Sequence, residues 1–133
     1  MWIQNVSLDD IVKAWHYDPG ENSILISIVD PDMEHPRAKY SFKERHNFKF
    51  FDVDSEQEHS ITNEQANTLA QILIKAKQKH SNVVVHCVAG ICRSGAIVEC
   101  GVALGFEDTQ TLRIPNVLVK TKILNCLINN GAL

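Results

Sequence analysis

The sequence contains few of the residues that interrupt or cross-link a chain, and it has no long hydrophobic run. Among its 133 residues are four cysteines, four prolines and six glycines, and aromatic residues account for 7%. Cysteines this few, all from residue 87 onward, do not build a small secreted fold held together by disulfides. The low glycine and proline content excludes a collagen-like chain, and no stretch approaches the ~20 apolar residues of a membrane helix.

Neither positive nor negative charge is present in large excess. The formal net charge is −3 and charged residues make up 22%, so the chain lacks the basic character that attracts nucleic acid or an anionic membrane. The first residues, MWIQNVSLDD, have neither the basic start nor the apolar core of a signal peptide. We therefore expect one cytoplasmic domain over residues 1–133, monomeric by default, that binds neither nucleic acid nor membrane.

Short β-branched runs alternate with amphipathic segments along the chain. We expect strands at residues 2–6, 24–29, 47–52 and 83–85, and helices at 8–14, after Thr62, at 94–104 and after Pro115-Asn116. Thr62 and Gln65 form the capping-box pattern of a helix start. The last helix is expected to bury Val117, Ile123, Leu124, Leu127 and Ile128. This alternation predicts an α/β fold with a small central, mostly parallel sheet and helices on both faces.

The segment VVVHCVAGICRSG, residues 83–95, combines a buried strand, a short loop and the start of a helix. Such a loop directs several backbone N–H groups at one place, and the helix N-terminus adds a partial positive charge, so the segment predicts an anion-binding site. Gly90 allows a backbone conformation that a side chain would forbid, and the planar guanidinium of Arg93 can bind two phosphate oxygens. The residues expected to bind the phosphate are Val88, Ala89, Gly90, Ile91, Cys92 and Arg93.

Cys87 stands at the base of this loop. The N–H groups that bind a phosphate dianion also stabilise a thiolate, so Cys87 is the candidate nucleophile. Ser94 is expected to donate a hydrogen bond to the sulfur and so make it a better leaving group in a second step. His86 is expected to orient the loop through its ring N–H and not to act as a base.

The string HCVAGICRSG resembles the His-Cys-x5-Arg-Ser/Thr signature of the cysteine-based protein tyrosine and dual-specificity phosphatases. The chain is similar to short bacterial and phage tyrosine-phosphatase-like proteins over roughly residues 48–127. The resemblance implies a dual-specificity-phosphatase-like fold and hydrolysis of phosphotyrosine, with phosphoserine and phosphothreonine as further candidates. It also implies a phosphocysteine intermediate, a phosphorylated protein or peptide as substrate, and a reaction that needs no cofactor and no metal.

The same resemblance requires an aspartic acid upstream of Cys87 that protonates the leaving oxygen and then acts as a base. Asp52 and Asp54 both qualify. Asp52 continues the alternation of Phe48 and Phe50 and fits an aspartate at the end of a strand. Asp54 lies closer to the usual distance from the next helix cap, so one of the two is the expected acid, with Asp52 preferred.

Cys92 is open to two interpretations. The string ICRS also occurs in the low-molecular-weight tyrosine phosphatases, in which the two loop cysteines can pair, and this suggests a reversible Cys87–Cys92 disulfide that protects the nucleophile from over-oxidation. The alternative is that Cys92 only fills space inside the loop. Those phosphatases place their loop at the N-terminus, so their fold is not expected here, although Asp108 would then be the acid. Cys100 and Cys126 are expected to be core thiols.

The side chains inside the loop carry no charge, which favours a substrate with a single phosphate monoester. The short chain predicts a shallow pocket that admits phosphoserine and phosphothreonine as well as phosphotyrosine. Two other functions remain open: a phosphate-binding module with little catalysis, and another thiolate enzyme such as an arsenate reductase or a sulfurtransferase.

The aromatic and histidine residues outside the motif carry no functional expectation. Trp2 and Trp15 are expected to pack the N-terminal strand and helix. The histidines expected to be solvated are His16, His35, His46, His59 and His80.

Overall fold

The computed structural model describes residues 1–14 and 17–133, and it confirms the α/β fold. The described strands form one sheet in the order β3-β2-β4-β1-β5, and every neighbouring pair runs parallel. They are β1 (Trp2–Val6), β2 (Ser23–Val29), β3 (Glu44–Lys49), β4 (Asn82–His86) and β5 (Glu107–Asp108). Because all strands are parallel, their carboxyl ends meet at one edge of the sheet, where α/β proteins bind ligands.

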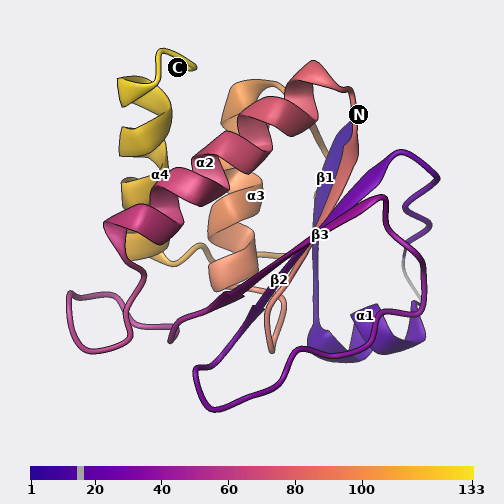
Figure 1. Ribbon diagram of the computed structural model, residues 1–133, viewed down its shortest axis with the longest axis horizontal. Coiled ribbons are helices and arrows are strands. Elements are labelled where there is room, and N and C mark those ends of the chain that lie inside the picture. Colours follow the sequence, from indigo (N-terminus) through magenta and orange to yellow (C-terminus); the bar gives the residue numbers. More distant parts are fainter. Residues whose placement is uncertain (15–16) are drawn as a thin grey trace.

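Helices cover both faces of the sheet unequally. They are α1 (Leu8–Lys13), α2 (Asn63–Gln78), α3 (Arg93–Leu104) and α4 (Val117–Asn129). The three longer helices α2, α3 and α4 pack together on one face and enclose the larger core, whereas the short α1 lies on the other face (Figure 1). Tyr40 and Phe42, from the segment that precedes β3, help α1 to cover this second face.

The ends of three helices are capped where the sequence predicts. Ser7 accepts a hydrogen bond from the Asp10 N–H at the start of α1. Thr62 and Gln65 make both hydrogen bonds of the capping box at the start of α2. Gly105 ends α3 in a left-handed conformation with a φ of 113°, as a glycine at a helix C-terminus usually does.

The third strand differs from the prediction. It was expected at residues 47–52 but spans Glu44–Lys49. Its partner β2 ends at Val29, opposite Lys49, and the last backbone hydrogen bond between them is donated by the Phe50 N–H to the Val29 carbonyl oxygen at 3.2 Å. Phe50 is fully buried, and its carbonyl oxygen accepts a hydrogen bond of 2.7 Å from Arg93. Asp52 therefore lies in a loop and not at a strand end.

The buried face of α4 was only partly predicted. Ile123 and Leu127 are fully buried as expected, and Val119 completes this stripe at intervals of one helical turn. Val117 and Ile128 were expected in the core but are 69% and 55% exposed. Both lie off the turn-by-turn stripe, so α4 presents them to solvent.

The described part of the chain has no helix that is long and apolar enough to cross a membrane. Trp2 packs against the second core, as expected. The expectations for Trp15 and His16 concern residues outside the described part of the chain.

Replacing Thr62 by alanine tests the capping box. We expect Thr62→Ala to lower the free energy of unfolding by about 1 kcal/mol, because an N-terminal N–H of α2 loses its acceptor. Thr68→Ala, the same change on an exposed position inside α2, is the control and should leave stability unchanged or slightly higher, since alanine has the better helix propensity. Urea denaturation measures both, and equal effects of the two substitutions would contradict the capping role.

Candidate active site

The loop between β4 and α3, residues 87–92, lies at the carboxyl edge of the sheet (Figure 1). Side chains cap the first N–H groups of α1, α2 and α4, but no side chain does so for α3 among the described residues. The first turn of α3 also contains no acidic residue. The positive end of this helix is therefore available to an anion held in the loop.

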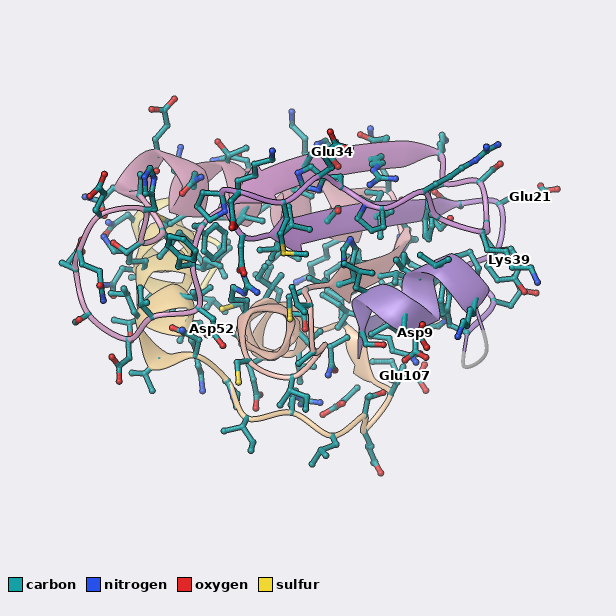
Figure 2. All side chains as sticks on the ribbon, turned by 90° about the horizontal axis from the view of Figure 1, so that it is seen from below. Asp9, Glu21, Glu34, Lys39, Asp52 and Glu107 are labelled. Atoms are coloured by element: carbon teal, nitrogen blue, oxygen red, sulfur yellow. The ribbon has the colours of Figure 1, made fainter. Side chains whose placement is uncertain are left out.

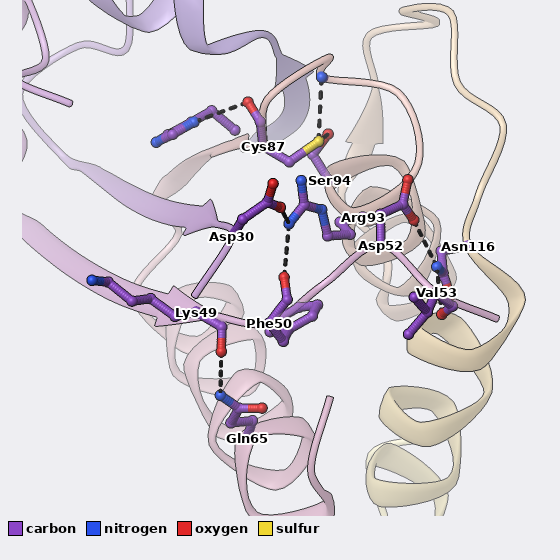
Figure 3. Close-up of polar contacts among 12 residues, drawn as sticks. Asp30, Lys49, Phe50, Asp52, Val53, Gln65, Cys87, Arg93, Ser94 and Asn116 are labelled. Atoms are coloured by element: carbon purple, nitrogen blue, oxygen red, sulfur yellow. Dashed lines mark hydrogen bonds and ion pairs between the residues drawn. The ribbon is translucent and has the colours of Figure 1, made fainter. Parts of the chain in front are cut away.

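Cys87 is buried at the base of the loop, with 2% of its surface exposed. Its Sγ accepts a hydrogen bond from the Gly90 N–H at 3.2 Å and lies 3.2 Å from the Ser94 Oγ (Figure 3). A thiolate cannot donate, so the Ser94 hydroxyl is the donor whenever the sulfur is ionised. The structure thus brings together the predicted nucleophile and the predicted serine.

Gly90 sits where no other residue fits. Its φ is 75°, and a Cβ at this position would overlap the backbone of Val6 and Ser7. The close approach is tied by two hydrogen bonds: the Leu8 N–H donates to the Val88 carbonyl oxygen at 3.1 Å, and the Asn5 side chain donates to the Gly90 carbonyl oxygen at 2.7 Å. The end of β1 and the start of α1 therefore support the loop.

Arg93 is a buried cation at the start of α3. Its Nη1 donates to Asp30 Oδ1 and to the Phe50 carbonyl oxygen, both at 2.7 Å (Figure 3). Its Nε–H is buried and has no hydrogen-bond partner within the described residues. A buried donor without a partner is costly unless a ligand supplies the acceptor, so this N–H is available to a phosphate oxygen.

The two candidate acids are placed differently. Asn116, which caps α4, donates from its Nδ2 to Asp52 Oδ1 at 2.7 Å and to the Val53 carbonyl oxygen at 3.0 Å, while its backbone N–H donates to the Cys92 carbonyl oxygen at 3.0 Å. Asp52 is thereby held beside the loop, on the side of Arg93 (Figure 3). Asp54 is exposed further along the same segment.

Asp108, the acid of the alternative fold, is engaged elsewhere. Arg113 binds both of its carboxylate oxygens, at 2.7 and 2.9 Å. These hydrogen bonds lower the pKa of Asp108 to about 2, which keeps it ionised and unable to donate a proton near neutral pH.

His86 is fully buried behind the loop and hydrogen-bonded at both ring nitrogens. Its Nδ1 lies 3.2 Å from the Cys87 carbonyl oxygen, which can only accept, so Nδ1 carries the hydrogen. Its Nε2 then accepts from the Ser27 hydroxyl at 2.6 Å, and Ser27 Oγ in turn accepts from His35 Nδ1 at 2.7 Å. Burial lowers the pKa of His86 to about 4, so the ring is neutral and contacts the loop backbone through its Nδ1–H.

His35 was expected to be solvated, and this expectation is wrong. The ring is half-buried and donates to Ser27, and burial together with the nearby Arg45 charge lowers its pKa. The segment before β3 places His35 against Ser27 of β2. β2 pairs with β4, the strand that leads into the loop.

The remaining cysteines differ in environment. Cys100 is fully buried, and burial raises its pKa to about 12, as suits a core thiol. Cys126 is half-buried against the larger core. Cys92 lies within the loop, and burial followed by the Asp52 charge raises the pKa of its thiol. All four cysteines are free thiols.

Within the described residues, no cluster of histidine, cysteine and carboxylate side chains could hold a metal ion.

Sequence reasoning missed four polar residues that organise the site. Asp30, Asn116, Ser27 and Asn5 contact Arg93, Asp52, His86 and the Gly90 carbonyl oxygen, respectively. Three of them carried a signal: Ser27 and Asn5 are polar residues within mostly apolar strands, and Asp30 directly follows a buried strand at its carboxyl end. Asn116 was recognised only as a helix start, because nothing local indicates that its amide reaches Asp52.

A family model described as protein-tyrosine phosphatase matches residues 28–122, which is more than half of the chain. The chain belongs to the protein-tyrosine phosphatase family. It is a cysteine-based phosphatase, and the family implies phosphoproteins as substrates. The match begins earlier than the resemblance in the sequence indicated, and it includes the end of β2 and Asp30.

Solved structures share the fold at low sequence identity. A human tyrosine phosphatase-like serine/threonine/tyrosine-interacting protein is 14% identical, with a TM-score of 0.61 over 97% of this chain and 93% of that one. A mouse protein described as a dual specificity phosphatase is 15% identical, with a TM-score of 0.56 over 86% and 76%. The tyrosine phosphatase OH1 of the Orf virus is 17% identical, with a TM-score of 0.52 over 77% and 55%. A search of curated protein sequences found no match.

The neutral, buried His86 predicts a specific loss of stability in acid. The unfolded chain takes up a proton at the ordinary histidine pKa near 6.5, whereas the folded protein resists it until about pH 4. The free energy of unfolding should therefore fall as the pH drops through this window, by roughly 3 kcal/mol from this residue.

Urea denaturation between pH 7 and pH 4 measures this dependence. In His86→Gln the His86 contribution should disappear, so the curve becomes flatter than in the wild type. His80→Gln, at an exposed histidine, should leave the curve unchanged. A His86→Gln curve as steep as the wild-type curve would show that the ring is not neutral in the folded protein.

Proposed function

We propose that the protein hydrolyses phosphotyrosine monoesters of protein substrates through a phosphocysteine intermediate. One observation carries this proposal: Cys87 Sγ, the unpaired Nε–H of Arg93 and the carboxyl group of Asp52 are held around the same loop (Figure 3). A phosphate bound by the loop N–H groups and Arg93 would have the sulfur on one side and the Asp52 carboxyl group near its ester oxygen.

The reaction then proceeds in two steps. The Cys87 thiolate attacks phosphorus, the bond to the ester oxygen breaks, and protonated Asp52 gives its proton to the departing phenolate. Ionised Asp52 next takes a proton from a water molecule as that water attacks the phosphocysteine. Inorganic phosphate leaves and the thiolate returns, stabilised by hydrogen bonds from Ser94 and the Gly90 N–H.

Asp52 is our choice of acid over Asp54 because Asn116 connects it to the loop. The same side chain binds the Asp52 carboxylate, and its backbone binds the Cys92 carbonyl oxygen, so a movement of the loop carries Asp52 with it. Asp30 is a positioning residue, because it orients the guanidinium of Arg93 and neutralises its buried charge.

The substrate range follows from the loop. Its phosphate-binding residues Val88, Ala89, Gly90, Ile91 and Cys92 supply backbone N–H groups and no charged side chain besides Arg93. This supports a single phosphate monoester, with phosphoserine and phosphothreonine as further substrates. We also propose that residues 1–133 act as one domain in the cytoplasm, where free thiols persist.

Substitutions of the two aspartates test the proposed acid. Asp52→Asn should lower kcat toward a phosphotyrosine peptide by about 10²–10⁴-fold and remove the alkaline fall of the pH–rate profile, whereas Asp54→Asn should have little effect. The loss in Asp52→Asn should be much smaller with para-nitrophenyl phosphate, whose leaving group needs less protonation. A greater loss in Asp54→Asn would make Asp54 the acid.

Two further variants separate the proposed reaction from its alternatives. Cys87→Ser should bind phosphopeptide without turnover, and Arg93→Lys should lose most activity because an ammonium cannot replace the planar guanidinium. EDTA should leave the rate unchanged. Phosphopeptide binding with no turnover by the wild type would favour a phosphate-binding module, and reduction of arsenate or transfer of sulfur without phosphatase activity would favour another thiolate enzyme.

We propose in addition that Cys87 and Cys92 form a reversible disulfide under oxidation. Peroxide converts the Cys87 thiolate to a sulfenic acid, and the Cys92 thiol displaces water from it to close the disulfide. The raised pKa of Cys92 keeps it a thiol, so peroxide does not attack it first, and it loses its proton only as it attacks the sulfenic acid.

Mass spectrometry after mild peroxide treatment tests this pairing. The expected product is a peptide pair joined through Cys87 and Cys92, with phosphatase activity that returns on adding dithiothreitol. The variant Cys92→Ala should instead accumulate irreversibly oxidised Cys87, whereas Cys126→Ala should behave as the wild type. Sulfinic Cys87 with Cys92 still free in the wild type would refute the pairing and leave Cys92 as a filler of the loop.

A further inference from the structure

The connection between β5 and α4, together with the first residue of α4, carries the most exposed large hydrophobic side chains of the described residues. Leu112, Ile114 and Val117 are 74%, 67% and 69% exposed, respectively. In the adjacent loop, Val88 is 40% exposed. Figure 2 shows this connection crossing the end of the molecule from the side of Glu107 toward the side of Asp52. We call Leu112, Ile114, Val117 and Val88 the apolar rim.

The connection is bound directly to the phosphate-binding loop. The Ile114 N–H donates to the Ile91 carbonyl oxygen at 3.2 Å. Asn5 bridges the two segments, because its Nδ2 donates to the Leu112 carbonyl oxygen at 2.9 Å as well as to that of Gly90. The apolar rim therefore lies beside the place where the phosphate of a substrate is bound.

The exposure of these side chains does not come from a loosely held loop. Arg113, between Leu112 and Ile114, turns inward with its side chain 11% exposed and pairs with Asp108 at 2.7 Å and with Glu99 at 3.4 Å. It also packs against α3 at Gly95, where an added Cβ would lie 2.8 Å from the Arg113 Cβ. The backbone is thus anchored, and the neighbouring apolar side chains are directed to solvent.

The surroundings indicate which ligand these side chains fit. The cation of this segment, Arg113, is already paired with carboxylates, so the rim offers no charge to nucleic acid or lipid phosphate. On the other side of the loop, Asp52 and Asp54 are exposed and would repel an acidic peptide. An extended peptide advances about 3.3 Å per residue, so its first few residues beside a bound phosphoresidue can reach the rim.

We propose that the apolar rim binds hydrophobic side chains that flank the phosphorylated residue of a protein substrate. The proposal rests on the proposed function, since the bound phosphate determines where the flanking residues lie. Leu112 and Ile114 are then specificity-determining residues that lower KM for such substrates. They do not contribute to the chemical step.

The test compares two phosphotyrosine peptides that differ only in having leucine or serine at the positions flanking the phosphotyrosine. The wild type should show a kcat/KM about tenfold higher for the leucine peptide, mostly through KM, as expected for partial burial of an apolar side chain. The double variant Leu112→Ser/Ile114→Ser should lose this preference and keep its rate with para-nitrophenyl phosphate. Ile128→Ser, an exposed isoleucine in the last turn of α4, is the matched control and should keep the preference.

The outcomes separate this inference from the proposed function. Equal rates for both peptides in the wild type, or a preference that survives the double substitution, would overturn the apolar rim while leaving the phosphatase activity established. If the wild type turns over no substrate, binding of both peptides to Cys87→Ser, with and without the double substitution, still measures the preference. A dimer in sedimentation that the double substitution abolishes would overturn the proposal by making the rim an interface between two copies of this chain.

Discussion

Gly90 brings the phosphate-binding loop against the end of β1, and the remaining geometry of the site depends on this close approach. Any side chain at Gly90 would overlap the backbone of Val6 and Ser7, so only glycine permits the contact. In this position the Gly90 N–H points at the sulfur of Cys87, and its carbonyl oxygen accepts from Asn5. A loop further from β1 would lose its hydrogen bonds with Asn5 and Leu8 and therefore its support from the strand and from α1.

The positive potential at the loop comes from two sources, the guanidinium of Arg93 and the N-terminus of α3. Arg93 supplies the buried cation, with Asp30 as its partner, and α3 begins without a side-chain cap. His86 lies behind the loop but stays neutral, because burial and the neighbouring cations lower its pKa. The ring can therefore serve as a fixed donor to the loop backbone without adding a second charge there.

Much of the fold and the centre of the site could be predicted, because their signals are local. The motif around Cys87 and Arg93 specifies its own loop and the start of α3. Thr62 and Gln65 specify the start of α2 within four residues. The errors concern contacts over long distances. Asp52 was expected at a strand end, but β3 stops where its neighbour β2 stops, and no residue near Asp52 reports the length of another strand.

The sequence by itself determined the family, the candidate nucleophile and the candidate phosphate-binding loop, because the chemistry requires these residue types at fixed spacing along a continuous stretch. Only the tertiary structure decided which carboxylates serve that loop. Asp30, Asp52 and Asp108 are equally acidic side chains in the sequence, yet one orients Arg93, one is held at the loop by Asn116, and one is bound by Arg113. Their roles depend on which partners the parallel sheet and the helix starts bring within hydrogen-bond distance, and those partners lie far away along the chain.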